Sequence, residues 1–271
     1  MSILLASAAC SSPAAEHAVT PVPTRPRIVA HRGASATAPE NTVAAFRHAW
    51  ELGVESVELD MHLTRDGEVV VMHDPTTKRT AGVELVIAKS TLAELQALDV
   101  GRWKSPAYAG ERIPTIADAL ATIPSGRTMF LEIKPGADTA PAIARAIRAA
   151  DPRPRGGQIA IQGFDARAIT ALGRELPGVP VYWTVDPPVE GEDQILPYPL
   201  AILDEAVQHG FAGIALYHGA TSDALVDKAR AAGLLVDVWT LNEPAELAHW
   251  ATRDVRWIET DRPDLVARQP R

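Results

Sequence analysis

The stretch VELDMHLTRDGEVVVMHDP (57–75) places two carboxylates inside a run that otherwise has the composition of a buried strand. Successive side chains of a strand point to opposite faces, so Glu58 and Asp60 share one face while apolar side chains occupy the other. An Asp-Gly pair follows, which predicts a hairpin turn, and a second apolar run then ends at His73. The stretch therefore predicts a hairpin with one apolar face and one charged face.

Outward from this hairpin, short β-rich runs alternate with helical patterns along the chain. The expected strands span residues 27–33, 55–63, 128–134, 158–164, 180–185, 213–218, 234–241 and 256–260. The expected helices span residues 40–53, 115–123, 139–150, 165–176, 201–210, 221–233 and 244–254. With 68–74 counted as a hairpin partner, this pattern favours an α/β fold, a (β/α)8 TIM barrel, and a doubly wound open sheet is the alternative. Residues 75–114 are expected to form an irregular excursion with one short helix at 90–99.

Length and composition narrow the class of protein. A chain of 271 residues with 46% hydrophobic and 22% charged residues is typical of one globular barrel domain, not of a disordered chain or a multi-span membrane protein. The net charge of −8 gives no basic footprint for a nucleic-acid partner. No pattern points to a protein partner or to an oligomeric state.

Residues 1–26 differ from the rest of the chain. A short apolar and small-residue run ends at Cys10, the only cysteine, and a Ser/Pro/Ala-rich linker follows it. This resembles the end of a bacterial lipoprotein signal, although no Lys or Arg precedes Cys10. We expect an exported, periplasmic or membrane-anchored lipoprotein tethered through Cys10. The alternative is a cytoplasmic protein with an incidental cysteine.

In a TIM barrel the reactive groups lie at the carboxyl ends of the strands. The polar and aromatic residues at those predicted ends are His31, Arg32, Glu58, Asp60, Glu132, Lys134, Gln162, Trp183, His218, Trp239 and Asn242. Carboxylates in a barrel mouth are costly to bury unless they are paired or bind a cation. The oxygen ligands of Glu58, Asp60 and Glu132 suit Ca²⁺ or Mg²⁺ better than zinc. A structural charge network with Arg32 and Lys134 is the alternative.

Two histidines extend this candidate site. His31 and His73 both follow buried strands and are expected at the rim that carries the carboxylates. They could serve as general base and general acid, because imidazole titrates near neutral pH; a structural role is the alternative for each. Arg32 and Lys134 are candidates for holding an anion. A cation, cationic side chains, a base and an acid are what cleavage of a phosphodiester requires.

Residues at the remaining strand ends are candidates for the substrate slot. Trp239 and Trp183 are expected to form walls of the slot, unless they belong to the core. Gln162 and His218 are expected to contact the substrate.

At these residues the sequence resembles the glycerophosphodiester phosphodiesterase family. The resemblance covers residues 27–265, and its ordered set of motifs is far more specific than any single one. The matching stretches are AHRGASATAPENTVAAF, ELDMHLTRDGEVVVMHD, GERIPTIADAL, LEIKPG, DVWTLN and TDRPDL.

The resemblance implies a TIM-barrel catalytic domain over 27–271 and a small insertion at about 75–114. It implies one divalent cation, Ca²⁺ or Mg²⁺ with Mn²⁺ as a further option, held by Glu58, Asp60 and Glu132. It implies acid/base catalysis by His31 and His73, and Arg32 and Lys134 near the phosphate. The products would be sn-glycerol 3-phosphate and an alcohol. Either the 2-hydroxyl of the substrate attacks phosphorus, giving a cyclic phosphate that is then hydrolysed, or water attacks directly.

Two positions depart from the family pattern. Gly163 stands where Ser is frequent, and Glu259 stands in a last strand that is usually apolar. Both are expected near the mouth or the lower pocket, where they would affect substrate preference. One rival function is cleavage of lysophospholipids by a phospholipase D or lyase of the same superfamily. Another is a noncatalytic barrel that binds phosphodiesters or polyols. A metal-independent phosphatidylinositol-cleaving relative is disfavoured by the three carboxylates.

Overall fold

The computed structural model describes residues 25–150, 154, 157–191 and 193–267. Cys10 and nearly all of the segment that resembles a lipoprotein signal lie outside these residues. None of the described helices is long and apolar enough to cross a bilayer.

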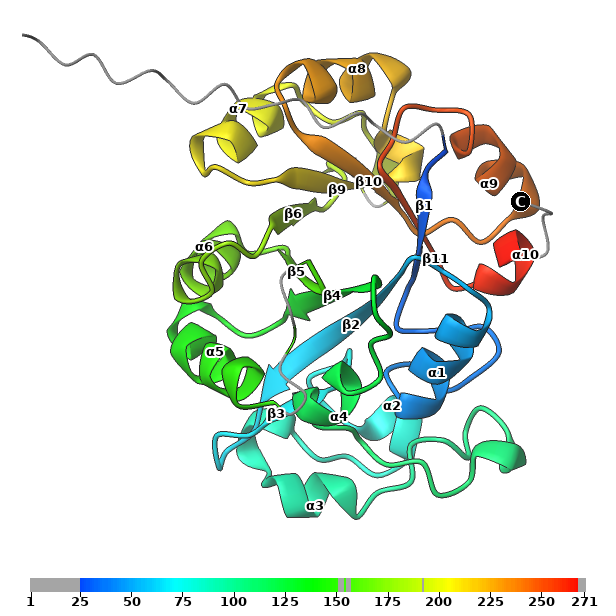
Figure 1. Cartoon of the computed structure of the whole chain (residues 1–271), viewed down its shortest axis with the longest axis vertical. Helices are drawn as coiled ribbons and strands as arrows, with labels where there is room; N and C mark the ends of the chain where they lie inside the picture. The colour runs from blue at the N-terminus through cyan, green and yellow to red at the C-terminus, as the bar shows by residue number, and fades with distance from the viewer. Residues whose placement is uncertain (1–24, 151–153, 155–156, 192, 268–271) are drawn as a thin grey trace, which may run out of the picture.

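Parallel strands form a closed barrel at the centre of the molecule (Figure 1). In chain order they are β1 (Arg27–Ala30), β2 (Ser56–Leu63), β4 (Thr128–Ile133), β5 (Ile159–Gly163), β6 (Val181–Val185), β9 (Gly213–Tyr217), β10 (Leu235–Trp239) and β11 (Trp257–Thr260). Around the barrel their order is β1, β11, β10, β9, β6, β5, β4 and β2. Parallel pairing of Ala30 with Val57 joins β2 back to β1. This closure confirms the TIM barrel and excludes the open sheet.

Helices surround the barrel (Figure 1). They are α1 (Val43–Glu51), α4 (Ile116–Leu120), α5 (Ala140–Ala149), α6 (Ala166–Glu175), α7 (Ala201–Gln208), α8 (Asp223–Ala231), α9 (Pro244–Trp250) and α10 (Pro263–Ala267), with the 3-10 turns η3 (Ala137–Thr139) and η4 (His218–Ala220). The first seven are shorter than their patterns predict, and polar side chains cap the first residues of several of them. Thr42, for example, caps α1 by accepting a hydrogen bond from the backbone N–H of Ala45 at 3.2 Å.

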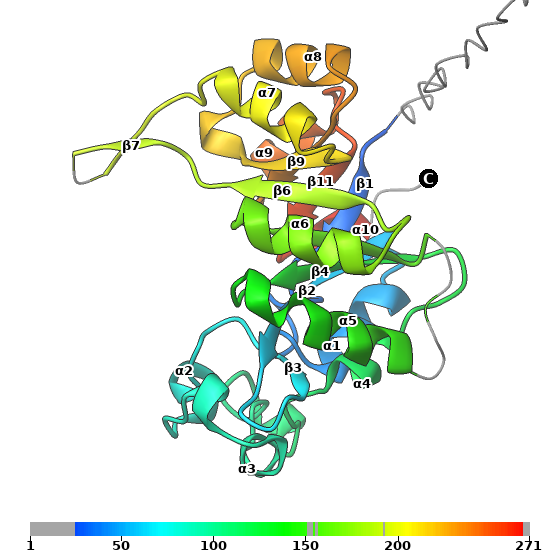
Figure 2. The ribbon, with the colours of Figure 1, turned by 90° about the vertical axis from the view of Figure 1, so that its left-hand side faces the viewer.

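The predicted hairpin partner is β3 (Val69–Val71), which pairs antiparallel with β2. The excursion that follows contains α2 (Lys78–Ala81), η1 (Ile87–Lys89), α3 (Leu92–Gln96) and η2 (Pro106–Tyr108). Its own small core includes Ile87, Leu95 and Ile113. Figure 2 shows this insertion as a separate lobe at one end of the molecule, beside β3.

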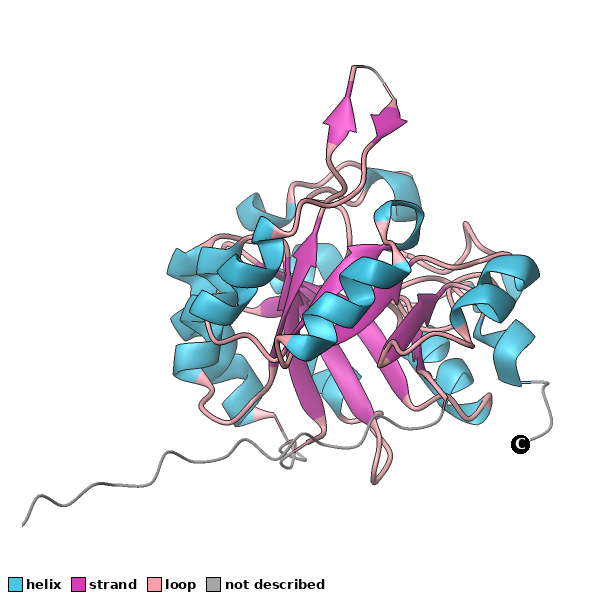
Figure 3. Ribbon diagram, turned by 90° about the horizontal axis from the view of Figure 1, so that it is seen from above, coloured by secondary structure: helices cyan, strands magenta, loops and turns pink. Residues whose placement is uncertain are grey.

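A second hairpin, β7 (Val189–Glu190) and β8 (Gln194–Ile195), follows β6. Figures 2 and 3 show it projecting from the body of the barrel. The sequence patterns predict no element here.

The barrel interior changes character along its strands. An apolar cluster of Val29, Phe130, Ala160, Tyr182 and Trp257 fills one level. Two residues farther along β4, β5 and β11, the inward positions carry buried polar side chains, Glu132, Gln162 and Glu259. Side chains that point outward pack beneath the helices. The alternation of a strand therefore gives each of these strands an apolar outer face and a polar upper interior.

Candidate active site

The three carboxylates predicted as cation ligands lie together. One oxygen each from Glu58, Asp60 and Glu132 lies within 4.8 Å of the others. All three side chains are buried. Oε1 of Glu58 is buried without a hydrogen-bond partner among the described residues. An orphaned carboxylate oxygen within an all-oxygen cluster fits a hard divalent cation.

The cationic side chains border this cluster. The Lys134 ammonium lies 2.9 Å from Oδ1 of Asp60 and also pairs with Glu132. The Arg32 guanidinium lies 3.4 Å from Oδ2 of Asp60. The backbone N–H of Arg32, at a φ of 56°, donates to Oε2 of Glu58 at 2.9 Å. The left-handed turn after β1 therefore attaches the chain to the carboxylate cluster.

The cluster has an uneven charge balance. Burial raises the pKa of Glu58 well above its ordinary range, and the neighbouring charge of Asp60 adds to this. Burial, together with Asp60, also raises the pKa of Glu132. Burial alone would raise the pKa of Asp60 as well, but Lys134 and Arg32 outweigh it and hold that pKa below the ordinary range. Burial therefore makes the charged forms of Glu58 and Glu132 less favourable, and a bound cation would stabilise those charged forms.

Asn41 supports Asp60 and was missed among the predicted site residues. Its amide donates to Oδ2 of Asp60 at 2.7 Å, and its carbonyl oxygen accepts from the Asp60 backbone N–H at 3.2 Å. Asn41 is buried and has a φ of 57°, a backbone region that Asn tolerates better than most residues. The available signal was its place in the Pro-Glu-Asn-Thr run before α1.

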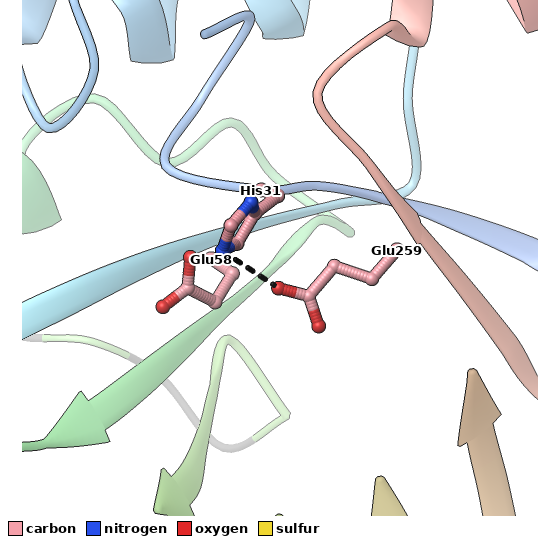
Figure 4. A group of neighbouring side chains, drawn as sticks. All are labelled: His31, Glu58 and Glu259. Carbon is pink, nitrogen blue, oxygen red and sulfur yellow. Dashed lines mark ion pairs between the residues drawn. The ribbon is translucent and has the colours of Figure 1, made fainter. Parts of the chain in front are cut away.

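His31 is held between two carboxylates of β11 and the loop after it. Its Nδ1 lies 2.7 Å from Oδ1 of Asp261. Its Nε2 lies 3.8 Å from Oε1 of Glu259, and Figure 4 shows the His31 ring between Glu58 and Glu259. Ser35 and Asn242 donate to Asp261 at 2.8 and 2.7 Å. Asp261 can therefore orient the imidazole of His31 for proton transfer.

Glu259 faces this site, as its departure from the family pattern led us to expect. It is 2% exposed, and Gln162 donates to its Oε2 at 3.5 Å. Burial, together with the neighbouring carboxyl group of Asp237, raises the pKa of Glu259 well above its ordinary range. The expectation for Gly163 was wrong, because Gly163 faces α6. A Cβ there would lie 2.8 Å from the side chain of Ile169.

His73 lies at the junction of the barrel and the insertion. Its Nδ1 lies 2.8 Å from Oδ1 of Asp74, and its backbone oxygen lies 3.1 Å from Nε2 of His62. Burial lowers the pKa of His73. Asp74 was not predicted, although it stands beside His73 in the sequence.

The aromatic wall differs in part from the prediction. The Trp239 ring packs edge-on against Phe164 and Tyr217, with centroids 5.9 and 5.6 Å apart. Its Nε1 is buried and has no hydrogen-bond partner within the described part of the chain. The Phe164 ring, 5.7 Å from Nζ of Lys134, joins Trp239 to the charged cluster and was not predicted.

Trp183 does not line a substrate slot, which corrects the prediction. Its neighbour Tyr182 belongs to the interior cluster, so Trp183 points outward. Trp183 packs against Phe211 and donates from Nε1 to the carbonyl of Phe164 at 3.0 Å. It supports the wall from behind.

Gln162 lies beside the carboxylate cluster. It pairs in register with Glu132 on the neighbouring strand and donates to Glu259 at 3.5 Å. His218 lies in η4, with Nε2 3.7 Å from Oε1 of Glu246 and its ring against Tyr217. His218 therefore reaches the rim near Trp239 through Tyr217.

Known proteins resemble this chain in sequence and in fold. Residues 31–265 match the model of the glycerophosphoryl diester phosphodiesterase family. The chain belongs to this family. It is 30% identical over 253 residues to YhdW of Bacillus subtilis (strain 168), covering 88% of this chain and 96% of that protein. It is 27% identical to a glycerophosphodiester phosphodiesterase of the same strain, covering 90% of this chain and 86% of that enzyme.

Solved structures agree. A phosphodiesterase of Oleispira antarctica, in complex with the product sn-glycerol-3-phosphate, superposes with a TM-score of 0.79 at 28% identity, covering 88% of this chain and 94% of that one. Family membership confirms the resemblance and the predicted class of enzyme, a phosphodiesterase of glycerophosphodiesters.

Proposed function

We propose that this enzyme releases sn-glycerol 3-phosphate and an alcohol from glycerophosphodiesters, and that it needs one divalent cation held by Glu58, Asp60 and Glu132. The observation that supports this most is the buried cluster of these carboxylates with an orphaned Glu58 oxygen. Such a cation polarises a phosphoryl oxygen when bound. The product bound to the Oleispira antarctica phosphodiesterase supports the same cleavage here. Ca²⁺, Mg²⁺ and Mn²⁺ are the candidate ions.

His31 is the proposed general base and His73 the proposed general acid. Asp261 holds Nδ1 of His31, which leaves Nε2 to take the proton of the attacking hydroxyl. Asp74 holds Nδ1 of His73, which leaves Nε2 to protonate the departing alkoxide as the P–O bond breaks. The attacking hydroxyl belongs either to water or to C2 of the glycerol, in which case a cyclic phosphate forms and is then hydrolysed.

Arg32 and Lys134 are the proposed partners of the phosphate charge. Both are paired with Asp60, so they already lie at the edge of the cluster where an anion beside the cation would sit. Trp239 and Phe164 are the proposed wall for the glycerol or the alcohol.

The test follows sn-glycerol 3-phosphate release from glycerophosphocholine and glycerophosphoethanolamine, after EDTA treatment and after adding back each candidate cation. We expect EDTA to abolish release and at least one cation to restore it. Glu58→Gln should weaken cation affinity at least tenfold by titration calorimetry, because a liganding carboxylate is lost. Full release in EDTA, or unchanged cation affinity in the variant, would contradict the proposal.

Cleavage of lysophospholipids is a second candidate, favoured by exposed apolar side chains. Phe164 is 37% exposed at the mouth, and Val189 and Ile195 are 55% and 42% exposed on the projecting hairpin. The same assay with lysophosphatidylcholine distinguishes the two substrates. Faster turnover of the lysolipid than of glycerophosphocholine would favour this second candidate.

We also propose that the protein is exported and anchored through a lipid on Cys10. Membrane fractionation of cells that express the wild type and Cys10→Ser tests this. Equal amounts of both proteins in the soluble fraction would contradict it.

A further inference from the structure

Arg79 of α2 lies between two carboxylates that come from different parts of the fold. Its Nε and Nη2 lie 2.8 and 3.1 Å from the two oxygens of Asp74. Its Nη1 and Nη2 lie 2.7 and 2.8 Å from the two oxygens of Glu40. The planar guanidinium therefore uses all three of its nitrogens, in one bidentate pair with each carboxylate.

Each of those carboxylates holds a residue of the proposed machinery. Asp74 binds Nδ1 of His73 at 2.8 Å. Glu40 accepts from Nη1 of Arg32 at 3.1 Å. A continuous chain of charged hydrogen bonds thus runs from His73 through Asp74, Arg79 and Glu40 to Arg32. It joins the proposed acid to the proposed phosphate-binding arginine.

The electrostatics favour this arrangement. The hydrogen bonds from Arg79 hold the pKa of Asp74 at about 2. Burial opposes ionisation of Glu40, but Arg79 and Arg32 outweigh it and lower the pKa of Glu40. Both carboxylates are therefore ionised at neutral pH. Arg79 itself is 42% exposed, so its pairs contribute little to overall stability, and their consequence is geometric.

The insertion also contacts the loop between β1 and α1 through two other side chains. Lys104 donates to the carbonyl of Ser35 at 2.6 Å, and Tyr108 donates to the carbonyl of Thr37 at 3.2 Å. Both carbonyls belong to the loop between β1 and α1, which carries Arg32 and Glu40. The insertion is thus attached to this loop at three places, and Arg79 is the only one of these contacts that also reaches His73 through a shared carboxylate.

We propose that Arg79 is a positioning residue of the insertion, which sets the place of the leaving-group acid relative to the bound phosphate by holding Asp74 and Glu40 together. This inference rests on the proposed role of His73. It predicts that the loss of Arg79 affects most the substrates whose alcohol must be protonated as it leaves.

The test compares two diesters of sn-glycerol 3-phosphate at saturating cation. The choline ester departs as an alkoxide that needs a proton, whereas the 4-nitrophenyl ester departs as a phenolate that does not. For Arg79→Gln we expect kcat/KM to fall on the order of tenfold to a hundredfold for the choline ester, since misplaced acids lose this much. For the nitrophenyl ester we expect a fall of about threefold or less, because proton transfer from the acid contributes little there.

The matched control is Lys78→Gln. Lys78 precedes Arg79 in α2 and carries the same charge, but among the described residues its ammonium donates only to the carbonyl of Gly82, at 3.4 Å. We expect Lys78→Gln to leave kcat/KM unchanged for both substrates. Arg79→Lys keeps the charge but loses the planar guanidinium. We expect it to lower kcat/KM more for the choline ester than for the nitrophenyl ester, as Arg79→Gln does.

Two outcomes would overturn the inference, and His73→Ala tells them apart. Suppose that Arg79→Gln lowers kcat/KM equally for both substrates, while His73→Ala leaves kcat/KM for the nitrophenyl ester nearly unchanged. Arg79 then has only a structural role, and the assignment of His73 stands. If His73→Ala also lowers kcat/KM equally for both substrates, the assignment of His73 as the acid fails, and the inference about Arg79 fails with it.

Discussion

At the residue scale, Asp237 is a buried carboxyl with no role in the proposed chemistry. It points into the barrel from β10 and is fully buried, and neither oxygen has a hydrogen-bond partner among the residues described. Burial raises its pKa to about 8. A carboxyl of this kind stays protonated in the folded protein at neutral pH, while in the unfolded chain it ionises near its ordinary pKa of about 3.9.

We expect Asp237→Asn to stabilise the protein at pH 8 and to have little effect on the pH dependence below pH 4. Between these limits the folded state binds one more proton than the unfolded state, so wild-type stability falls as pH rises, and the asparagine removes this fall. The gain at pH 8 should exceed the gain at pH 5 by on the order of 2–4 kcal/mol, since one pKa unit corresponds to about 1.4 kcal/mol. Urea unfolding in EDTA at pH 5 and pH 8 measures it. Asp204→Asn, on the exposed face of α7, is the control. An equal effect of Asp237→Asn at both pH values would show that Asp237 is already ionised.

At the element scale, the loop between β1 and α1 positions both His31 and Arg32. Gly33 has a φ of 81° in this loop, and a Cβ there would lie 2.7 Å from the backbone carbon and the Cβ of Ala45 in α1. The loop and the helix can approach this closely only because residue 33 is glycine.

Gly33→Ala should therefore separate the loop from α1 and move His31. We expect destabilisation of about 2–4 kcal/mol from the positive φ and the clash together, and loss of most of the activity. Gly67→Ala is the matched control, because Gly67 has a φ of 85° with nothing within 4 Å of its Cβ position. Urea unfolding of both variants isolates the clash. Equal destabilisation of the two would mean that the contact with α1 is not required.

Local patterns predicted the elements well but not the contacts between them. Strand ends placed the carboxylates and His31 at one rim, because parallel strands of a barrel share their direction. Asp261 escaped prediction because its partner, His31, lies 230 residues earlier in the chain. Arg79 escaped for the same kind of reason, since Glu40 precedes it by 39 residues.

Two further misses have local causes. The hairpin of β7 and β8 was missed because each strand has only two residues, too few to show an alternating pattern. Trp183 was placed at the mouth from its position near a strand end. Neighbouring residues of a strand point to opposite faces, and Tyr182 points into the barrel, where it packs against Phe130. Trp183 therefore points outward, which the sequence alone does not show.

At the scale of the whole molecule, the barrel interior holds more acid than base. Glu58, Asp60, Glu132, Asp237 and Glu259 are all buried there. Within the described part of the chain, the arginine and lysine side chains that pair with this group are Arg32 and Lys134, and His31 lies 3.8 Å from Glu259. Buried carboxyl groups in excess must either take up protons or bind a cation. The stability of the barrel is therefore coupled to pH and to the binding of a cation at the carboxylate cluster.

A cation that binds the folded barrel should therefore raise the melting temperature of the entire domain. At a concentration of 100 times its Kd, mass action adds about 2.7 kcal/mol, which for a domain of this size corresponds to roughly 5–10 °C. Differential scanning calorimetry with each candidate cation, against EDTA, measures the shift and ranks the ions. Glu58→Gln should lose most of the shift, because the buried side chain of residue 58 can then no longer offer the cation a negative charge. A shift of the same size in this variant would place the stabilising cation at a different site on the protein.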